Sequence, residues 1–134
     1  MRVGIPKEVK SDEYRVSMMP VGVELLVKAG HEVYVEHDAG VGSGFTDDLY
    51  EKAGGKIVGT AKEVFDNADM IQKVKELQSQ EVGLCKPGQI VFTYFHFAAD
   101  RELLQACMEA EITAIAYETI KDKKGTLPLL TPMS

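Results

Sequence analysis

Short apolar runs alternate with amphipathic segments along almost all of this chain of 134 residues, and this alternation limits the possible folds more than any other feature. The apolar runs predict strands at residues 2–6, 32–36, 56–59, 69–75, 89–96 and 112–118. The segments between them predict helices at residues 20–29, 47–53, 62–67, 79–85 and 100–109. Such alternation indicates an α/β domain of the Rossmann-like or flavodoxin-like kind, with a mostly parallel sheet and helices on both faces.

Residues that begin and end helices support this interpretation. One helix is expected to begin at Pro20 and to end before Gly30, which is the usual placement of these residue types. Thr46 is a candidate N-cap for the next helix. The final run, TLPLLTPMS, stops at Ser134 although Pro-Met-Ser would suit the start of a helix. We therefore expect residues 1–134 to be a truncated domain.

Composition argues against several kinds of partner and site. The net charge of −6 does not favour a nucleic acid or an anionic membrane. The opening MRVGIP leads directly into a strand, and no apolar run has the roughly 18 residues that a membrane span needs, so neither a targeting segment nor a span is expected. Cys85 and Cys107 lack CxxC spacing, which predicts free structural thiols in a reducing, cytoplasmic compartment. No His or Cys pair has metal-ligand spacing, so no metal is expected.

Candidate functional residues follow the predicted strands. In an open parallel sheet, ligands bind beyond the carboxyl ends of the strands. A polar loop with Arg15 follows the first strand, Lys73 and Lys75 end the fourth, His96 ends the fifth and Glu118 ends the sixth. These residues are therefore expected to lie at one edge of the sheet.

The three cations allow two interpretations each. Arg15 is either a surface charge paired with Glu13 or a bidentate clamp for a carboxylate, which guanidinium geometry suits. Lys73 and Lys75 would face the same way on a strand, and either they end a solvated strand or one of them donates to a substrate oxygen.

His96 has a similar pair of interpretations. Its neighbours in VFTYFHFAAD are mostly apolar and aromatic, so it could be a core histidine with one backbone partner. Its position at the carboxyl end of a strand instead favours general acid–base chemistry, for which imidazole is well suited near neutral pH.

The segment GVGSG at residues 40–44 resembles a phosphate-binding loop. The dinucleotide motif requires a sixth-position glycine, where this chain has Phe45, and no clear helix opens directly from the segment. We interpret it as a flexible turn rather than as a cofactor site.

Taken together, the motifs resemble the family shared by alanine dehydrogenase and the alpha subunit of nicotinamide nucleotide transhydrogenase. The similarity begins with GIPKEVKSDEYRVSMMPVGV and continues through residues 30–54, KVKE, GQIVFTYFH, AYET and LPLLTPMS, so it covers the whole chain. Transhydrogenase subunits typically have asparagine at the position of Lys75 and lack a histidine at position 96. Leu77 departs from the family, which usually has proline there.

The resemblance implies the N-terminal, substrate-side domain of a cytoplasmic, homohexameric enzyme that oxidises L-alanine with NAD to pyruvate and ammonium. Arg15 and Lys75 would bind the substrate carboxylate and carbonyl oxygens, Tyr94 would line the pocket, and His96 would be the general acid–base. Met133 and Ser134 would lie near the nicotinamide end of NAD. Most of the NAD site would belong to a second domain beyond this chain, so the fragment alone is expected to be inactive.

Two alternatives from other classes remain at this point. The chain could be the N-terminal domain of a transhydrogenase alpha subunit, which is a component of a membrane proton pump, although Lys75 and His96 argue against this. It could also be a binding module for small carboxylates without catalysis.

Overall fold

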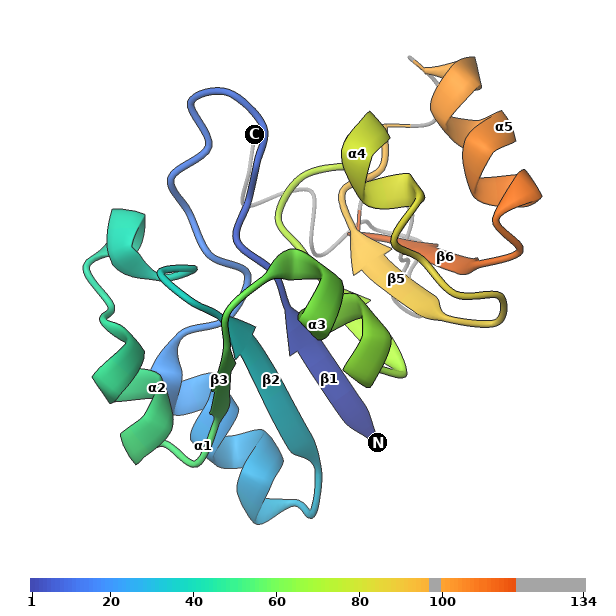
Figure 1. The fold of residues 1–134 in the computed structure, drawn as a ribbon. Coiled ribbons are helices and arrows are strands. Elements are labelled where there is room, and N and C mark those ends of the chain that lie inside the picture. The colour runs from blue at the N-terminus through green and yellow to red at the C-terminus, as the bar shows by residue number, and fades with distance from the viewer. Residues whose placement is uncertain (97–99, 118–134) are drawn as a thin grey trace, which may run out of the picture.

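A computed structural model of the chain describes residues 1–96 and 100–117. Glu118, Met133 and Ser134 lie outside these described residues. Within them, six parallel strands form one sheet in the order β3-β2-β1-β4-β5-β6 (Figure 1). The strands are β1 (Arg2–Ile5), β2 (Glu32–Glu36), β3 (Lys56–Val58), β4 (Met70–Gln72), β5 (Ile90–Thr93) and β6 (Thr113–Ala116). The prediction of an α/β domain with a parallel sheet is confirmed.

Helices connect the strands. They are α1 (Pro20–Lys28), α2 (Asp47–Lys52), α3 (Ala61–Asn67), α4 (Ser79–Val82) and α5 (Arg101–Glu109), and a short 3-10 helix, η1, spans Val41–Ser43. The chain moves outward from β1 to β3 and then returns to β4 on the other side of β1 (Figure 1). Right-handed crossovers in both directions require helices on opposite faces of the sheet.

Two apolar cores confirm that both faces are covered. On one face α1 and α2 pack against the first strands, and the buried residues are Ile5, Val23, Val33, Val35, Ala39 and Tyr50. On the other face lie α3, which contacts β1 and β2, and α5, and the buried residues include Val64, Phe65, Ile71, Val91, Phe95, Leu103 and Cys107.

Gly4 allows α3 to lie close to β1. A Cβ atom at this position would be 2.8 Å from Ala68 Cβ and 2.8 Å from Val64 Cγ1, which is too close for any larger residue without a shift of the helix. The first strand can therefore be central in the sheet and still contact a helix directly.

The strands are shorter than the sequence suggests at the edge where ligands are expected. β4 ends at Gln72 rather than at residue 75, and β5 ends at Thr93 rather than at His96. Residues beyond these ends are held by side chains more than by strand pairing, which an apolar pattern does not reveal.

Thr46 occupies the N-cap position of α2, but its side chain makes no capping hydrogen bond. Within the described residues, no helix is long and apolar enough to cross a membrane.

Candidate functional site

The strand order reverses between β1 and β4, and in sheets of this kind ligands bind where the order reverses. A cavity of about 600 Å³ opens there, lined by residues from the loops that follow β1, β2, β4, β5 and β6. Its walls are formed by Arg15, Val16, Ser17, Met19, Ser43, Phe45, Gln72, Lys73, Val74, Phe92, Tyr94 and Tyr117. The carboxyl edge of the sheet therefore gathers several of the residues that the sequence singles out.

Arg15 lies in the loop after β1 and is held by Glu13. Its Nε donates to Glu13 Oε2 at 2.9 Å and its Nη2 donates to Oε1 at 2.8 Å, so the pair is bidentate. The Arg15 backbone N–H also donates to Oε2 at 2.9 Å. The hydrogen bond from Arg15 holds the pKa of Glu13 below its ordinary value, and the same bond raises the pKa of Arg15. The pairing that the sequence suggested is present, and it fixes the guanidinium in one orientation.

The GVGSG segment at residues 40–44 contacts the loop that carries Arg15. Ser43 Oγ donates to the Tyr14 carbonyl at 3.2 Å, and a Cβ at Gly42 would lie 2.5 Å from the same oxygen. No α-helix opens directly from the segment, because α2 begins only at Asp47, although η1 gives the segment more regular structure than a simple turn. The space that a glycine-rich loop would offer a phosphate is therefore filled by the backbone of this chain.

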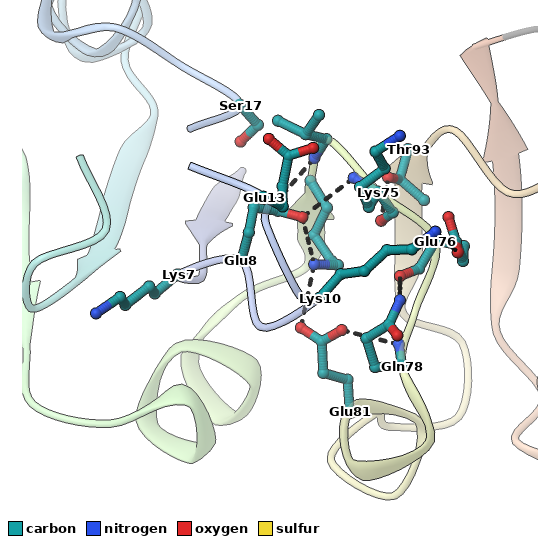
Figure 2. A network of polar contacts seen from close by, with 12 residues as sticks. Lys7, Glu8, Lys10, Glu13, Ser17, Lys75, Glu76, Gln78, Glu81 and Thr93 are labelled. Carbon is teal, nitrogen blue, oxygen red and sulfur yellow. Dashed lines mark hydrogen bonds and ion pairs between the residues drawn. The ribbon is translucent and has the colours of Figure 1, made fainter. Parts of the chain in front are cut away.

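The two lysines after β4 have different surroundings, contrary to the expectation that they face the same way. Lys73 is fully buried, and its Nζ lies 2.9 Å from Glu8 Oε1 and 3.1 Å from Glu81 Oε2. Figure 2 labels these two glutamates. Lys75 is half-buried and lines a cavity of about 380 Å³ together with Arg15. Among the described residues no ion pair or hydrogen bond involves the Lys75 Nζ, whereas the Lys73 Nζ is paired with two carboxylates.

Glu8 was not identified from the sequence as a site residue. Its side chain is 1% exposed and uses both oxygens, since Oε1 also accepts from the Lys75 backbone N–H at 3.1 Å and Oε2 accepts from the Val74 N–H at 3.1 Å. Glu81 is also buried, and burial raises the pKa of its carboxyl. The only sequence signal for this network was the position of Glu8 in the loop after the first strand.

His96 is exposed, so the interpretation as a packed core histidine is wrong. Its backbone φ is 57°, in the left-handed region that a residue with a side chain adopts at a cost of about 1–3 kcal/mol. The Tyr94 ring stacks beside the imidazole at a centroid distance of 6.4 Å. His96 lines a cavity of about 410 Å³ with Lys10, Glu76, Phe95 and Asp100.

Glu76 is a second residue that the sequence did not reveal. Lys10 Nζ donates to Glu76 Oε1 at 2.5 Å, whereas Glu76 Oε2 is buried and has no hydrogen-bond partner among the described residues. Burial is the largest single influence and acts to raise the pKa of Glu76, but the hydrogen bond from Lys10, a backbone hydrogen bond and the nearby positive charges together outweigh it, so the pKa lies below the ordinary value. His96 thus lies near a carboxylate with one oxygen unused.

Aromatic rings close the large cavity on the side of β5 and β6. The Tyr117 ring meets Phe92 at 4.2 Å and Tyr94 at 4.7 Å between centroids, both edge-to-face, and Tyr117 Oη donates to the Lys73 carbonyl at 3.0 Å. Burial raises the pKa of Tyr117 to about 12, so its hydroxyl keeps its proton. Tyr94 also lines this cavity, and the role in a substrate pocket that the resemblance implies for it stays a prediction.

The cavities also show which candidates lie together. Arg15 and Lys75 share one cavity, Arg15 and Tyr94 share another, and Lys10 lies in the walls of both the Lys75 and the His96 cavities. Arg15, Lys75 and Tyr94 therefore border two cavities that share Arg15, whereas His96 lines a separate cavity that shares only Lys10 with the Lys75 cavity.

Two further groups in the described residues bear on cofactors. His37, Asp38 and Asp47 have ligand atoms within 4.8 Å of one another, a grouping that sequence spacing did not suggest. His37 Nδ1 lies 2.5 Å from Asp47 Oδ2, and this hydrogen bond raises the His37 pKa. Members of the group are therefore already bonded to one another.

Cys85 and Cys107 are free thiols, and burial raises the pKa of Cys85 to about 12, which makes it a poor nucleophile.

Comparison with known proteins gives one consistent family. The family model "Alanine dehydrogenase/PNT, N-terminal domain" matches residues 4–134. Alanine dehydrogenases from Methanococcus maripaludis and Geobacillus stearothermophilus are 54% and 50% identical to the chain over 134 residues, which is 100% of this chain and 36% of each relative. The chain therefore spans little more than a third of the length of these relatives.

Solved structures agree with the sequence relatives. An L-alanine dehydrogenase matches 99% of this chain and 37% of its own chain with a TM-score of 0.96 and 47% identity. A transhydrogenase from Sinorhizobium meliloti matches 92% of this chain and 37% of its own chain with a TM-score of 0.85 and 33% identity. From its sequence and its fold, this chain belongs to the alanine dehydrogenase/PNT family, as the N-terminal domain.

Proposed function

We propose that residues 1–134 are the substrate-side domain of an NAD-dependent L-alanine dehydrogenase. One observation carries this proposal: Arg15 and Lys75, from different loops, line one cavity beyond the carboxyl ends of β1 and β4. A guanidinium and an ammonium together suit a substrate that has a carboxylate next to a carbonyl group. Pyruvate has both groups, and the relatives are named alanine dehydrogenases, so we take L-alanine as the corresponding amino acid.

Each residue then has a defined role in the proposed reaction, in which L-alanine, water and NAD give pyruvate, ammonium and NADH. Arg15 binds the substrate carboxylate, and Lys75 donates to the carbonyl oxygen and stabilises the negative charge that develops there. His96 accepts a proton from the water that attacks the imine carbon and returns a proton to the nitrogen as ammonia leaves. Tyr94 forms part of the pocket wall beside His96.

The described residues do not fit the pyrophosphate of a dinucleotide. The one glycine-rich loop, GVGSG, already has the Tyr14 carbonyl in the space where a phosphate would have to approach. The proposal therefore assigns NAD mainly to the part of the relatives that this chain does not cover, with Met133 and Ser134 near its nicotinamide end. No step of hydride transfer is assigned to the described residues.

A chimera tests the proposal. Residues 1–134 replace the matching segment of the Methanococcus maripaludis relative, and the product is assayed with L-alanine and NAD by the absorbance of NADH. The chimera is expected to produce NADH, whereas the chain alone is expected to produce none. NADH production by the chain alone, or an inactive chimera that unfolds cooperatively at the temperature of the relative, would contradict the proposal.

A transhydrogenase alpha subunit is the second candidate, because a named transhydrogenase shares the fold at 33% identity. Lys75 and His96 favour the alanine dehydrogenase, and so do the higher identities of 45–54% to alanine dehydrogenases. Hydride exchange between NADH and an NADP analogue by the chimera, without any dependence on alanine, would reverse this preference.

A carboxylate-binding module without catalysis is tested by titrating the chain alone with pyruvate in a calorimeter. Such a module should bind pyruvate by itself at micromolar concentrations.

We also propose that the complete enzyme is a cytoplasmic homohexamer, as its family implies, and light scattering on the chimera measures the mass that decides the oligomeric state.

A further inference from the structure

Glu8 binds the segment that contains Lys75. Glu8 lies in the loop after β1, and the Lys75 segment follows the neighbouring strand β4. We propose that Glu8 is a positioning residue, which sets the direction of the Lys75 side chain by binding the backbone N–H groups of Val74 and Lys75. This inference rests on the proposed role of Lys75 as a substrate-binding residue.

One carboxylate makes all of the contacts on which this inference depends. Glu8 Oε2 accepts from Val74 N at 3.1 Å, and Oε1 accepts from Lys75 N at 3.1 Å (Figure 2). Two successive N–H groups that point to one carboxylate restrict the backbone dihedrals of Val74 and the direction in which the Lys75 Cα–Cβ bond leaves the chain. Because the Glu8 side chain is 1% exposed, little water competes for these bonds.

The other backbone contacts of this segment within the described residues involve the Lys73 N–H and the carbonyl groups of residues 73–75, including a hydrogen bond from Tyr117 Oη to the Lys73 carbonyl at 3.0 Å. β4 ends at Gln72, and the later backbone contacts with the β5 side are Lys73 N to Phe92 O at 3.0 Å and Tyr94 N to Val74 O at 3.4 Å. Thr93 Oγ1 adds a hydrogen bond to the Lys75 carbonyl at 2.6 Å. Neither peptide N–H that Glu8 binds therefore has a strand partner, and the carboxylate satisfies both.

Lys73 explains how a carboxylate can be buried here. Its ammonium lies 2.9 Å from Glu8 Oε1 and 3.1 Å from Glu81 Oε2, and all three side chains are at most 2% exposed. A buried anion is costly unless a cation and hydrogen bonds compensate it. Lys73 supplies the charge and the two backbone N–H groups supply the hydrogen bonds, so Lys73 is not available to a substrate.

Glu81 provides a matched control because it shares Lys73 with Glu8 but contacts a different part of the backbone. Its Oε1 accepts from Gln78 N at 2.9 Å and not from the N–H groups of residues 74 and 75. Glu81→Gln therefore disturbs the same buried ammonium without releasing the backbone of Lys75. The two variants separate damage to the ion pair from loss of positioning.

The experiment compares Glu8→Gln and Glu81→Gln in the chimera by steady-state kinetics and by melting temperature. An amide at position 8 presents an NH₂ group to at least one of the three donors, so a backbone bond is lost. We expect Glu8→Gln to lower kcat/KM for pyruvate by about tenfold or more, because a misplacement of about 1 Å costs up to about 100-fold. Glu81→Gln is expected to keep kcat/KM within about threefold of the unmodified chimera, since it leaves the backbone of Lys75 in place.

A double-variant cycle shows whether Glu8 acts through Lys75. In the Lys75→Gln background, Glu8→Gln is expected to change the dissociation constant for pyruvate by less than about twofold, since residues that act as a unit are not additive. If Glu8→Gln fails to fold, the double variant Glu8→Gln/Lys73→Met removes the buried ammonium that has lost one of its two carboxylate partners, and this double variant is measured in its place.

The outcomes distinguish this inference from the proposed function. If Lys75→Gln alone has the kinetics of the unmodified chimera, the proposed role of Lys75 is wrong and this inference falls with it. If Lys75→Gln is impaired but folded Glu8→Gln is not, or if the two effects multiply independently, Glu8 does not position Lys75. Equal losses in Glu8→Gln and Glu81→Gln would also overturn the inference, because they would point to general damage.

Discussion

Replacing Arg15 by lysine tests the substrate site with the smallest change in charge. Arginine presents two parallel N–H groups to a carboxylate, and in this structure two such contacts, of 2.9 and 2.8 Å, already hold Arg15 on Glu13. A lysine keeps the positive charge but can replace only one of the two contacts with Glu13. Its single ammonium therefore cannot be held by Glu13 and also present a bidentate edge to a substrate.

The magnitude follows from the lost contact. A hydrogen bond between charged partners contributes about 1.5–3 kcal/mol. Because about 1.4 kcal/mol corresponds to a factor of ten, Arg15→Lys is expected to lower kcat/KM for pyruvate by about 10- to 100-fold, mainly through a higher KM. The effect on the free energy of unfolding should be small, about 0–1 kcal/mol, since the Arg15 side chain is 49% exposed.

The assay measures pyruvate-dependent oxidation of NADH by the chimera, together with a thermal melt. Arg2→Lys is the matched control: Arg2 also pairs with a glutamate, Glu32, at 3.0 Å, but it lies in β1 at the amino end of the strand. If Arg15→Lys keeps kcat/KM within about twofold of the unmodified chimera, or if Arg2→Lys loses as much, the reasoning about Arg15 is refuted.

Three further predictions concern other parts of the site and core. His96→Ala is expected to lower kcat by about 100-fold or more in NADH assays while the melting temperature hardly changes, and an unchanged kcat would remove His96 from the mechanism. Tyr50→Phe should lower the free energy of unfolding by about 1–3 kcal/mol in urea titrations, because the buried hydroxyl donates to the Met18 carbonyl at 2.8 Å and that carbonyl would lose its partner. Gly42→Ala places a Cβ 2.5 Å from the Tyr14 carbonyl and so displaces the loop that carries Arg15. It should raise the KM for pyruvate while the melting temperature changes little, and an unchanged KM would mean that this loop adapts to the added methyl group.

Much of the fold could be predicted because the helices and strands have local signals. The spacing of Val23, Leu26 and Val27 and the proline at position 20 predicted α1 almost to its observed bounds, Pro20–Lys28. The alternating run EVYVE predicted β2 with its observed bounds. Strand ends were predicted less well, since β4 ends at Gln72 and only two backbone hydrogen bonds, Lys73 N to Phe92 O and Tyr94 N to Val74 O, join the residues that follow to the β5 side.

The site was only partly predictable, because its strongest contacts join distant parts of the sequence. Lys73 and Glu8 are 65 positions apart, and no local pattern distinguishes a lysine that is buried on a carboxylate from one that is solvated. Spacing alone therefore did not distinguish Lys73 from Lys75, and only the family resemblance selected Lys75; in the structure the two lysines differ in burial and pairing. Glu13 was within local range of Arg15, two positions away, and that pairing was foreseen.

The left-handed backbone at His96 also has a consequence for protein engineering. Glycine adopts a φ of 57° without the steric cost that a side chain brings, so the backbone conformation at position 96 favours glycine over the histidine present. Variants selected for heat resistance alone should accumulate glycine there. Directed evolution that aims at a heat-resistant catalyst should therefore hold position 96 fixed or screen turnover in every round.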